Sequence, residues 1–171
     1  KVRQEVNEIL EKYDNQFTYD AMNEMTYLEK VFNETLRKYP PLPGAPRVCT
    51  KDYTVPGTDI TIKEGTHFSI PIMGIHYDPE YYPNPEVFDP ERFNEENTAK
   101  RPSYTHVPFG EGPRICIGSR FGRMQTKVGL AKIIKNFKVT LNEKTIHPLK
   151  LDTKSFILAP KGGMWVNVTR V

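Results

Sequence analysis

Hydrophobic positions in the first 39 residues recur at the spacing of amphipathic helices. Two sets of apolar residues three or four positions apart carry this pattern: Val2, Val6, Ile9 and Leu10, then Met22, Met25, Leu28, Phe32 and Leu36. They predict a first helix over about 1–13 and further helical structure over 18–39, with Thr18 as a helix cap. Pro40-Pro41 ends the helical run, because proline has no amide proton to donate to a preceding turn.

The middle of the chain lacks this periodicity. Turn residues in 40–75 separate short β-prone segments at 53–55, 60–62 and 67–70, which predict a small antiparallel sheet with hairpins. The stretch 76–108 is rich in proline and has little periodicity. We interpret it as an ordered meander rather than disorder, because several aromatic residues can pin it down: Tyr81, Tyr82, Phe88 and Phe93.

Helical spacing returns after Gly118 and gives way to β-prone segments near the C-terminus. Six apolar residues predict a helix over 119–137: Phe121, Met124, Val128, Ala131, Ile134 and Phe137. The tail, 138–171, predicts strands around 139–141, 156–158 and 165–168, with Lys161-Gly162-Gly163 as a hairpin turn between the last two.

Composition and charge narrow the class of protein. The chain is 37% hydrophobic and 26% charged, and its net charge is +3 (24 basic minus 21 acidic residues), which is too small to indicate nucleic-acid binding. Two cysteines exclude a disulfide framework, and no run of 18 apolar residues predicts a membrane span. The opening Lys1-Val2-Arg3 enters a helical pattern at once, so we expect this chain to be part of a larger protein.

The residues from Phe109 to Gly118 carry the candidate chemistry. Gly110 and Gly112 permit a tight loop, and Cys116 lies where this loop meets the following helix, whose N-terminal amides favour a thiolate. From the residues alone, three roles of the cysteine remain open beside that of a thiolate presented by the loop. It could be a structural residue, a nucleophile partnered by His106, or a zinc ligand, although no further ligands stand at zinc spacing.

The whole ten-residue segment resembles the haem loop of the cytochrome P450 family. The matching positions are Phe109, Gly110, Gly112, Arg114, Cys116 and Gly118. The resemblance implies that the Cys116 thiolate is the axial ligand of the iron of haem b. Glu34-x-x-Arg37 resembles the family's K-helix motif, and Pro90-Glu91-Arg92-Phe93 resembles its meander motif. The resemblance implies that Glu34, Arg37 and Arg92 form a buried charge network that supports the haem loop without taking part in catalysis.

The similarity covers the whole chain and implies the C-terminal portion of a single, mainly α-helical P450 domain with small β-sheets. Its implied parts are the J and K helices (1–39), a β-region (40–75), the meander (76–108), the haem-thiolate loop (109–118), the L helix (119–137) and a C-terminal β-region with a terminal hairpin (138–171). By the same resemblance, Arg47 binds a haem propionate and Gly122 lies against the porphyrin, where the family often has alanine. Cys49 is interpreted as a small apolar strand residue.

The resemblance also implies an activity, and the style of the motifs is similar to that of insect xenobiotic-metabolising members found on the cytoplasmic face of the endoplasmic reticulum membrane. Such enzymes are monooxygenases that insert one oxygen atom of O2 into a small lipophilic substrate. Their electrons come from NADPH through NADPH–cytochrome P450 reductase, with cytochrome b5 as a further partner. We expect Arg120, Arg123 and Lys127 to form a basic docking face for the reductase.

Two other functions stay open at this point. One is a thiolate-haem isomerase or dehydratase on the same fold, and the other is a haem-binding remnant without turnover. The family's oxygen-activating threonine segment and membrane anchor do not occur in these 171 residues. We therefore expect this chain to be inactive when it is expressed alone. We also expect two apolar stripes to lack partners within the chain: Met25, Leu28 and Phe32, and Val128, Ala131 and Ile134.

Overall fold

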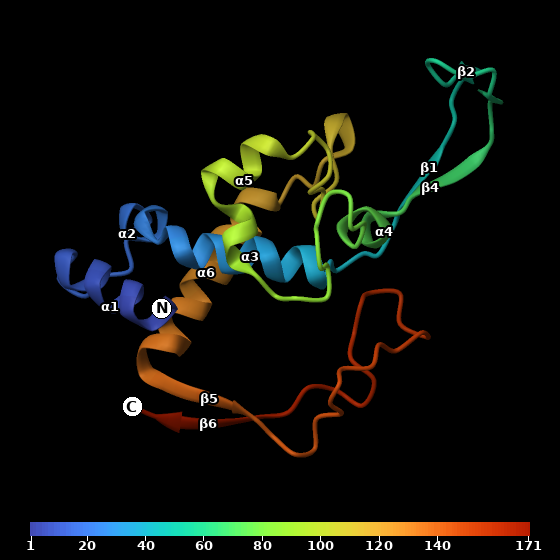
Figure 1. Cartoon of the computed structure of the whole chain (residues 1–171). Coiled ribbons are helices and arrows are strands. Elements are labelled where there is room, and N and C mark those ends of the chain that lie inside the picture. The colour runs from blue at the N-terminus through green and yellow to red at the C-terminus, as the bar shows by residue number, and fades with distance from the viewer.

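The computed structural model describes all residues from Lys1 to Val171 and is mainly helical (Figure 1). Its α-helices are α1 (Val2–Lys12), α2 (Tyr19–Glu24), α3 (Thr26–Lys38), α4 (Ile72–His76), α5 (Glu95–Lys100) and α6 (Ser119–Asn136), and two 3-10 helices are η1 (Pro90–Phe93) and η2 (Gly112–Arg114). The expected fold class, mainly α with small β-sheets, is confirmed. None of the helices has the length and apolar composition needed to cross a bilayer.

The core is formed by the first three helices and α6. Its fully buried residues are Val6, Leu10, Ala21, Met22, Met25, Leu28 and Ala131. Thr18 caps α2 as predicted, since its hydroxyl accepts a hydrogen bond from the amide of Ala21 at 3.1 Å. Helix α3 is not capped by a residue of its own. The carboxylate of Glu5 on α1 accepts hydrogen bonds from the backbone amides of Tyr27 and Leu28 at 2.6 and 2.8 Å.

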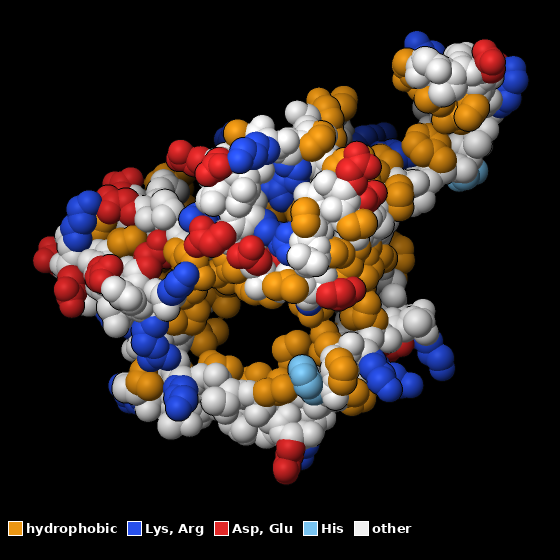
Figure 2. All heavy atoms as spheres, in the orientation of Figure 1, with side chains coloured by type: hydrophobic (Ala, Val, Ile, Leu, Met, Phe, Trp, Pro, Cys, Tyr) orange, Lys and Arg blue, Asp and Glu red, His pale blue; other side chains and the backbone are white.

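The expectation that the two apolar stripes lack partners was wrong for most of their residues. Met25, Leu28 and Ala131 are fully buried and Phe32 is 5% exposed, because α6 packs against α1, α2 and α3 within this chain. Exposed apolar side chains are spread over other parts of the chain, including the strands of the middle region, the cysteine loop and the strands of the tail. Figure 2 shows hydrophobic side chains around an opening between the helices and the side of the molecule that carries the tail strands.

Two two-stranded antiparallel sheets replace the single small sheet expected for the middle region, and a third lies in the tail. Strands β1 (Ala45–Val48) and β4 (His67–Ile70) pair, and beyond them β2 (Tyr53–Thr54) and β3 (Thr61–Ile62) form a hairpin that extends away from the body (Figure 1). The third sheet pairs β5 (Phe137–Leu141) with β6 (Val166–Arg170). The predicted hairpin between 156–158 and 165–168 is therefore wrong, because the last strand pairs with the segment that continues α6.

The turn at 161–163 is nevertheless present. Gly162 and Gly163 have φ of +79° and +82°, and the Gly163 amide bonds the carbonyl of Pro160 at 3.1 Å. It follows an isolated bridge between Leu151 and Pro160 rather than a regular strand.

The meander is ordered, but it contains two helical turns that the sequence pattern did not predict. In η1, Asp89 caps the amide of Glu91 at 3.0 Å, and in α5, Asn94 caps the amide of Asn97 at 2.7 Å. Helix α4 was also missed, inside the region expected to be β. These helices are short, with four to six residues, so hydrophobic periodicity has no room to develop.

Candidate functional site

A buried ion pair on α3 is the firmest feature of the candidate site. The Arg37 guanidinium donates to both carboxylate oxygens of Glu34, from Nε at 2.7 Å and from Nη2 at 2.9 Å. Both side chains are fully buried although they lie only three residues apart on one helix. A surface pair at this spacing is ordinarily solvated, so the burial indicates that another segment covers this face of α3.

The covering segment is the meander. Glu34 Oε1 accepts the amide of Asp89 at 2.9 Å, and Arg37 donates to the carbonyls of His76 at 2.9 Å and Pro85 at 2.8 Å. Arg92, whose side chain is 11% exposed, places Nε 3.6 Å from Glu34 Oε1. The structure thus brings Glu34, Arg37 and Arg92 together.

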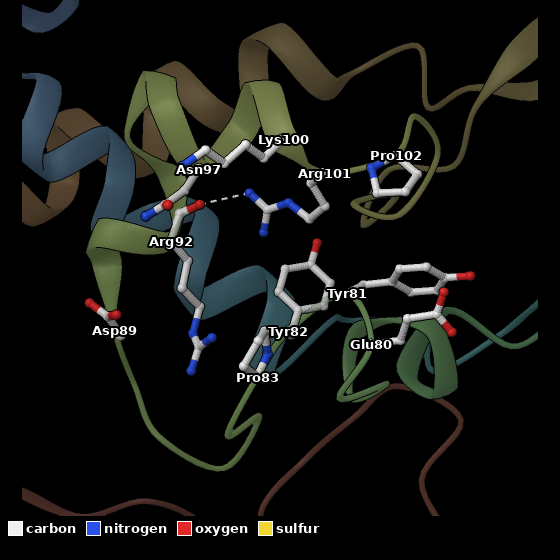
Figure 3. Close-up of a pocket in the computed structure, with 10 residues that line it drawn as sticks. All are labelled: Glu80, Tyr81, Tyr82, Pro83, Asp89, Arg92, Asn97, Lys100, Arg101 and Pro102. Carbon is white, nitrogen blue, oxygen red and sulfur yellow. Dashed lines mark hydrogen bonds between the residues drawn. The ribbon is translucent and has the colours of Figure 1, made fainter.

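Arg92 and Arg101 stand side by side at a pocket of about 330 Å³ in the meander (Figure 3). Arg101 donates to the Arg92 carbonyl at 2.7 Å, and its guanidinium lies 4.6 Å from the ring centroid of Tyr82 and 4.9 Å from that of Phe93. Arg92 donates to the carbonyl of Asn84 at 2.9 Å. These contacts join parts of the meander to one another. Cys116 does not line this pocket.

The cysteine loop closes on its own backbone. The amide of Cys116 donates to the carbonyl of Phe109 at 2.9 Å, and the amide of Ile115 donates to Gly112 at 3.0 Å. Gly110 and Gly112 have φ of +74° and +71°, a region that side chains with a Cβ rarely adopt. The two glycines therefore allow the loop to turn tightly enough to present Cys116.

Phe109 fastens this loop to α3. Its ring stacks on that of Phe32 with the centroids 6.5 Å apart, and the Arg123 guanidinium of α6 lies 5.2 and 5.9 Å from the two rings. The loop is therefore held between α3 and α6, two of the helices that form the core.

The thiol of Cys116 is exposed among apolar neighbours. Ile115 is 46%, Ile117 fully and Phe121 73% exposed, which is unusual for large aliphatic and aromatic side chains. A Cβ added at Gly122 would meet no atom within 4 Å, so α6 has open space beside this position. An open thiol bordered by apolar side chains fits a flat, apolar, metal-centred group such as haem.

Arg47, which was expected to bind a haem propionate, and Arg114 of the haem loop both lack carboxylate partners. Arg114 is exposed and Arg47 is half-buried on β1, and neither takes part in a salt bridge. The only side-chain hydrogen bond of Arg47 goes to the carbonyl of its neighbour Pro46, at 2.9 Å. Both guanidinium groups therefore remain available to an anion.

The predicted docking face is wrong for Lys127, and Arg123 is partly exposed but engaged in an ion pair. Lys127 is 4% exposed and places Nζ 3.1 Å from Glu29 Oε2, and Arg123 pairs with the other oxygen of the same carboxylate. Their charges are used inside the chain to join α6 to α3. Only Arg120 is exposed and free of such a pair.

The buried His76 and the half-buried His106 were not recognised as a pair from the sequence. The rings of His76 and His106 stack with centroids 5.3 Å apart, and His106 Nε2 lies 3.2 Å from the carbonyl of Asn33. His106 forms no bond to Cys116, which removes the support for a Cys–His nucleophile, and no cluster of three or more metal-binding side chains supports zinc. The apolar run that precedes His76, Ile70 to Ile75, was the only available signal of its burial.

Comparison with known proteins identifies the family. A family model described as cytochrome P450 matches residues 1–167. The chain is 48% identical over 172 residues to "Probable cytochrome P450 6a20" of Drosophila melanogaster, covering 100% of this chain and 34% of that protein. It is 48% identical to cytochrome P450 6k1 of Blattella germanica (96% of this chain, 31% of the relative) and 46% identical to cytochrome P450 6B1 of Papilio polyxenes (99% and 34%).

These relatives confirm the expected resemblance to insect members, and the chain spans about a third of their length. The family match over nearly the whole chain agrees with the mainly helical fold and with the exposed thiol in its glycine-rich loop. The chain belongs to the cytochrome P450 family.

Proposed function

We propose that the protein containing this chain is a haem-thiolate monooxygenase in which Cys116 is the axial ligand of the iron. The observation that carries the proposal is the exposed Cys116 thiol in a loop closed by Phe109 and two positive-φ glycines, in a chain of this family. A thiolate-ligated haem supplies the activation of dioxygen, because the sulfur donates electron density to the iron. The residues of this chain bind and orient that group.

Each predicted site residue has a definite task in this proposal. Gly110 and Gly112 keep the loop compact, and Phe109 anchors it on Phe32. A Cβ at Gly118 would lie 4.0 Å from Cys116 Sγ, an ordinary van der Waals contact, so this position borders the sulfur.

The outer parts of the haem are assigned to other residues. Arg114 and Arg47 bind the propionates as charge-assisted hydrogen-bond donors. Gly122 gives the porphyrin face room against α6, because no atom lies within 4 Å of a Cβ at that position.

The buried network acts behind the loop. Glu34, Arg37 and Arg92 hold the meander on α3, and α3 in turn supports Phe109 through Phe32. Their role is structural, because Arg37 donates to Glu34 and both arginines donate to backbone carbonyls of the meander, inside the protein. We therefore place it outside the reaction itself.

The substrate and partners are proposed from the family resemblance. We propose a small lipophilic organic substrate, as suits xenobiotic metabolism, and electron supply from NADPH through NADPH–cytochrome P450 reductase, with cytochrome b5 as a second donor. Of the three basic residues of α6 expected to dock the reductase, Arg120 remains exposed and free of a salt bridge. We place the protein on the cytoplasmic face of the endoplasmic reticulum membrane.

The test is turnover by the full-length protein with labelled dioxygen, NADPH and reductase, using a panel of lipophilic compounds. The proposal predicts one labelled oxygen atom in the product, with strict dependence on reductase and NADPH. Conversion of a peroxide substrate without reductase would instead establish the isomerase or dehydratase function. Haem binding with no turnover of either kind would establish the non-catalytic alternative.

A further inference from the structure

His76, the last residue of α4, uses both nitrogens of a fully buried ring. Nδ1 lies 3.1 Å from the carbonyl oxygen of Arg37, and Nε2 lies 3.1 Å from the backbone nitrogen of Val107. A backbone N–H can only donate, so Nε2 must be the unprotonated acceptor. Nδ1 then carries the proton and donates to the Arg37 carbonyl, which defines a single neutral tautomer.

These bonds join three segments of the chain. Arg37 also donates from Nη1 to the carbonyl of His76 at 2.9 Å, so α3 and α4 are bonded in both directions. Val107 begins the run into the cysteine loop, because its carbonyl accepts the amide of Gly110 at 2.9 Å. The next link is the Phe109 carbonyl, which accepts the amide of Cys116.

We infer that His76 is a positioning residue: its neutral ring ties the start of the cysteine loop, at Val107, to the Glu34–Arg37 pair and so holds the Cys116 thiolate in place. This inference rests on the proposed function, since the thiolate matters as a haem ligand. It assigns a task to a side chain that lies outside the three motifs of the family resemblance.

The surroundings of His76 favour its neutral form. The charged or titratable groups around its ring are Arg37 from α3, Arg101 after α5, His106 stacked on it, and Tyr82, whose ring edge is 6.3 Å away. Burial lowers the pKa of His76 to about 4. The positive charge of Arg37 lowers this pKa further, whereas the hydrogen bond to the Arg37 carbonyl partly raises it. Burial and the neighbouring His76 lower the pKa of His106 to about 3.

Protonation of His76 has a defined structural consequence. A protonated Nε2 cannot accept the Val107 amide, so that bond must break when the ring becomes charged. Because the folded pKa lies below the usual value of 6.5, the bond is fully present above about pH 6.5 and is lost as the pH falls through about 4. Loop position should therefore depend on pH in this acidic range.

Two substitutions in the full-length protein separate the two ring bonds. His76→Gln offers an amide oxygen near the position of Nε2 and does not titrate, so it retains the acceptor for Val107. His76→Asn offers a donor near the position of Nδ1 for Arg37 but leaves the Val107 amide buried without an acceptor. Both variants are compared with the wild type by hydrogen exchange of the Val107 amide and by the ferrous carbonyl spectrum between pH 3.5 and 8.

We expect His76→Asn to speed exchange of the Val107 amide by at least about tenfold at neutral pH and to lose part of the thiolate band. We expect His76→Gln to keep both near the wild type at neutral pH and to hold the thiolate band to a lower pH than the wild type. If His76→Asn does not fold, the pH profile of His76→Gln decides the matter alone.

The outcomes distinguish this inference from the proposed function. A wild type without any thiolate band contradicts the proposed function, while exchange of the Val107 amide still reports on the His76 bond. A normal thiolate band with unchanged exchange in His76→Asn overturns the inference. An acid profile of His76→Gln identical to that of the wild type overturns it as well.

Discussion

Replacing Glu34 by alanine removes the centre of the buried charge network. Its carboxylate accepts from Arg37 at 2.7 and 2.9 Å and from the Asp89 amide at 2.9 Å, and it lies 3.6 Å from Arg92 Nε. The Arg37 guanidinium is fully buried, so water cannot replace the lost partner. Removing one member of a buried pair costs about 3–5 kcal/mol of folding free energy.

A loss of that size is a large part of the 5–15 kcal/mol that typically stabilises a domain. We therefore expect Glu34→Ala in the full-length protein to yield little folded, haem-loaded protein. The assay is a denaturant melt combined with haem content, with Glu34→Gln as a milder variant that keeps an acceptor for Asp89. Glu24→Ala is the matched control, because its pair with Lys12 is 2.8 Å long but solvent-exposed, and such pairs contribute little.

The reasoning would be refuted if Glu34→Ala melted like Glu24→Ala. Normal haem content with low turnover would also refute it, because that result would assign Glu34 to catalysis.

Three further predictions follow from single contacts in the full-length protein. Gly110→Ala should lower the free energy of unfolding by about 1–2 kcal/mol, because the residue has φ of +74°. Gly122→Ala in α6 should be neutral or stabilising, and denaturant melts compare the two variants. Lys127→Met should lower the melting temperature more than Arg120→Met, since only Lys127 is buried and paired with Glu29, and equal melting temperatures would contradict the pairing. The wild type should lose stability as the pH falls from about 6.5 to 3, because a histidine with a lowered pKa binds its proton more readily in the unfolded chain. His106→Gln should lose less stability over this range, and an unchanged slope of stability against pH would contradict a neutral His106 ring in the folded protein.

The elements that could be predicted from sequence are those in which local pattern and packing agree. Helices α1, α3 and α6 each bury one apolar stripe, and Thr18 marks the start of α2 through its own side chain. The cysteine loop was recognised by its resemblance to the family's haem loop, and the positive φ of Gly110 and Gly112 explains why glycine occupies those two positions.

The errors arose where structure depends on distant partners. Strand β6 pairs with β5 in a register from Phe137–Arg170 to Leu141–Val166, and nothing local at 156–158 disfavours a strand there. The local sequence around Lys127 predicts a solvent-exposed lysine on a helix. In the structure Lys127 pairs with Glu29, which lies almost a hundred positions earlier on α3. Long-range pairing of this kind leaves no trace in hydrophobic periodicity.

The His76–Val107 bond is hidden for the same reason, because it joins residues 31 positions apart. A single histidine in a proline-rich region has no spacing partner, so its environment decides its role. The structure, and not the local sequence, shows that both of its ring nitrogens are occupied.

The ferrous carbonyl spectrum of the full-length protein tests the central claim, thiolate ligation by Cys116, most directly. The account predicts a strongly red-shifted Soret band in the wild type and in Cys49→Ser, because the Cys49 thiol donates to the carbonyl of Lys51 at 2.9 Å and has no ligand role. It predicts loss of that band in Cys116→Ser and Cys116→His. An unchanged red-shifted band in either Cys116 variant would contradict the assignment.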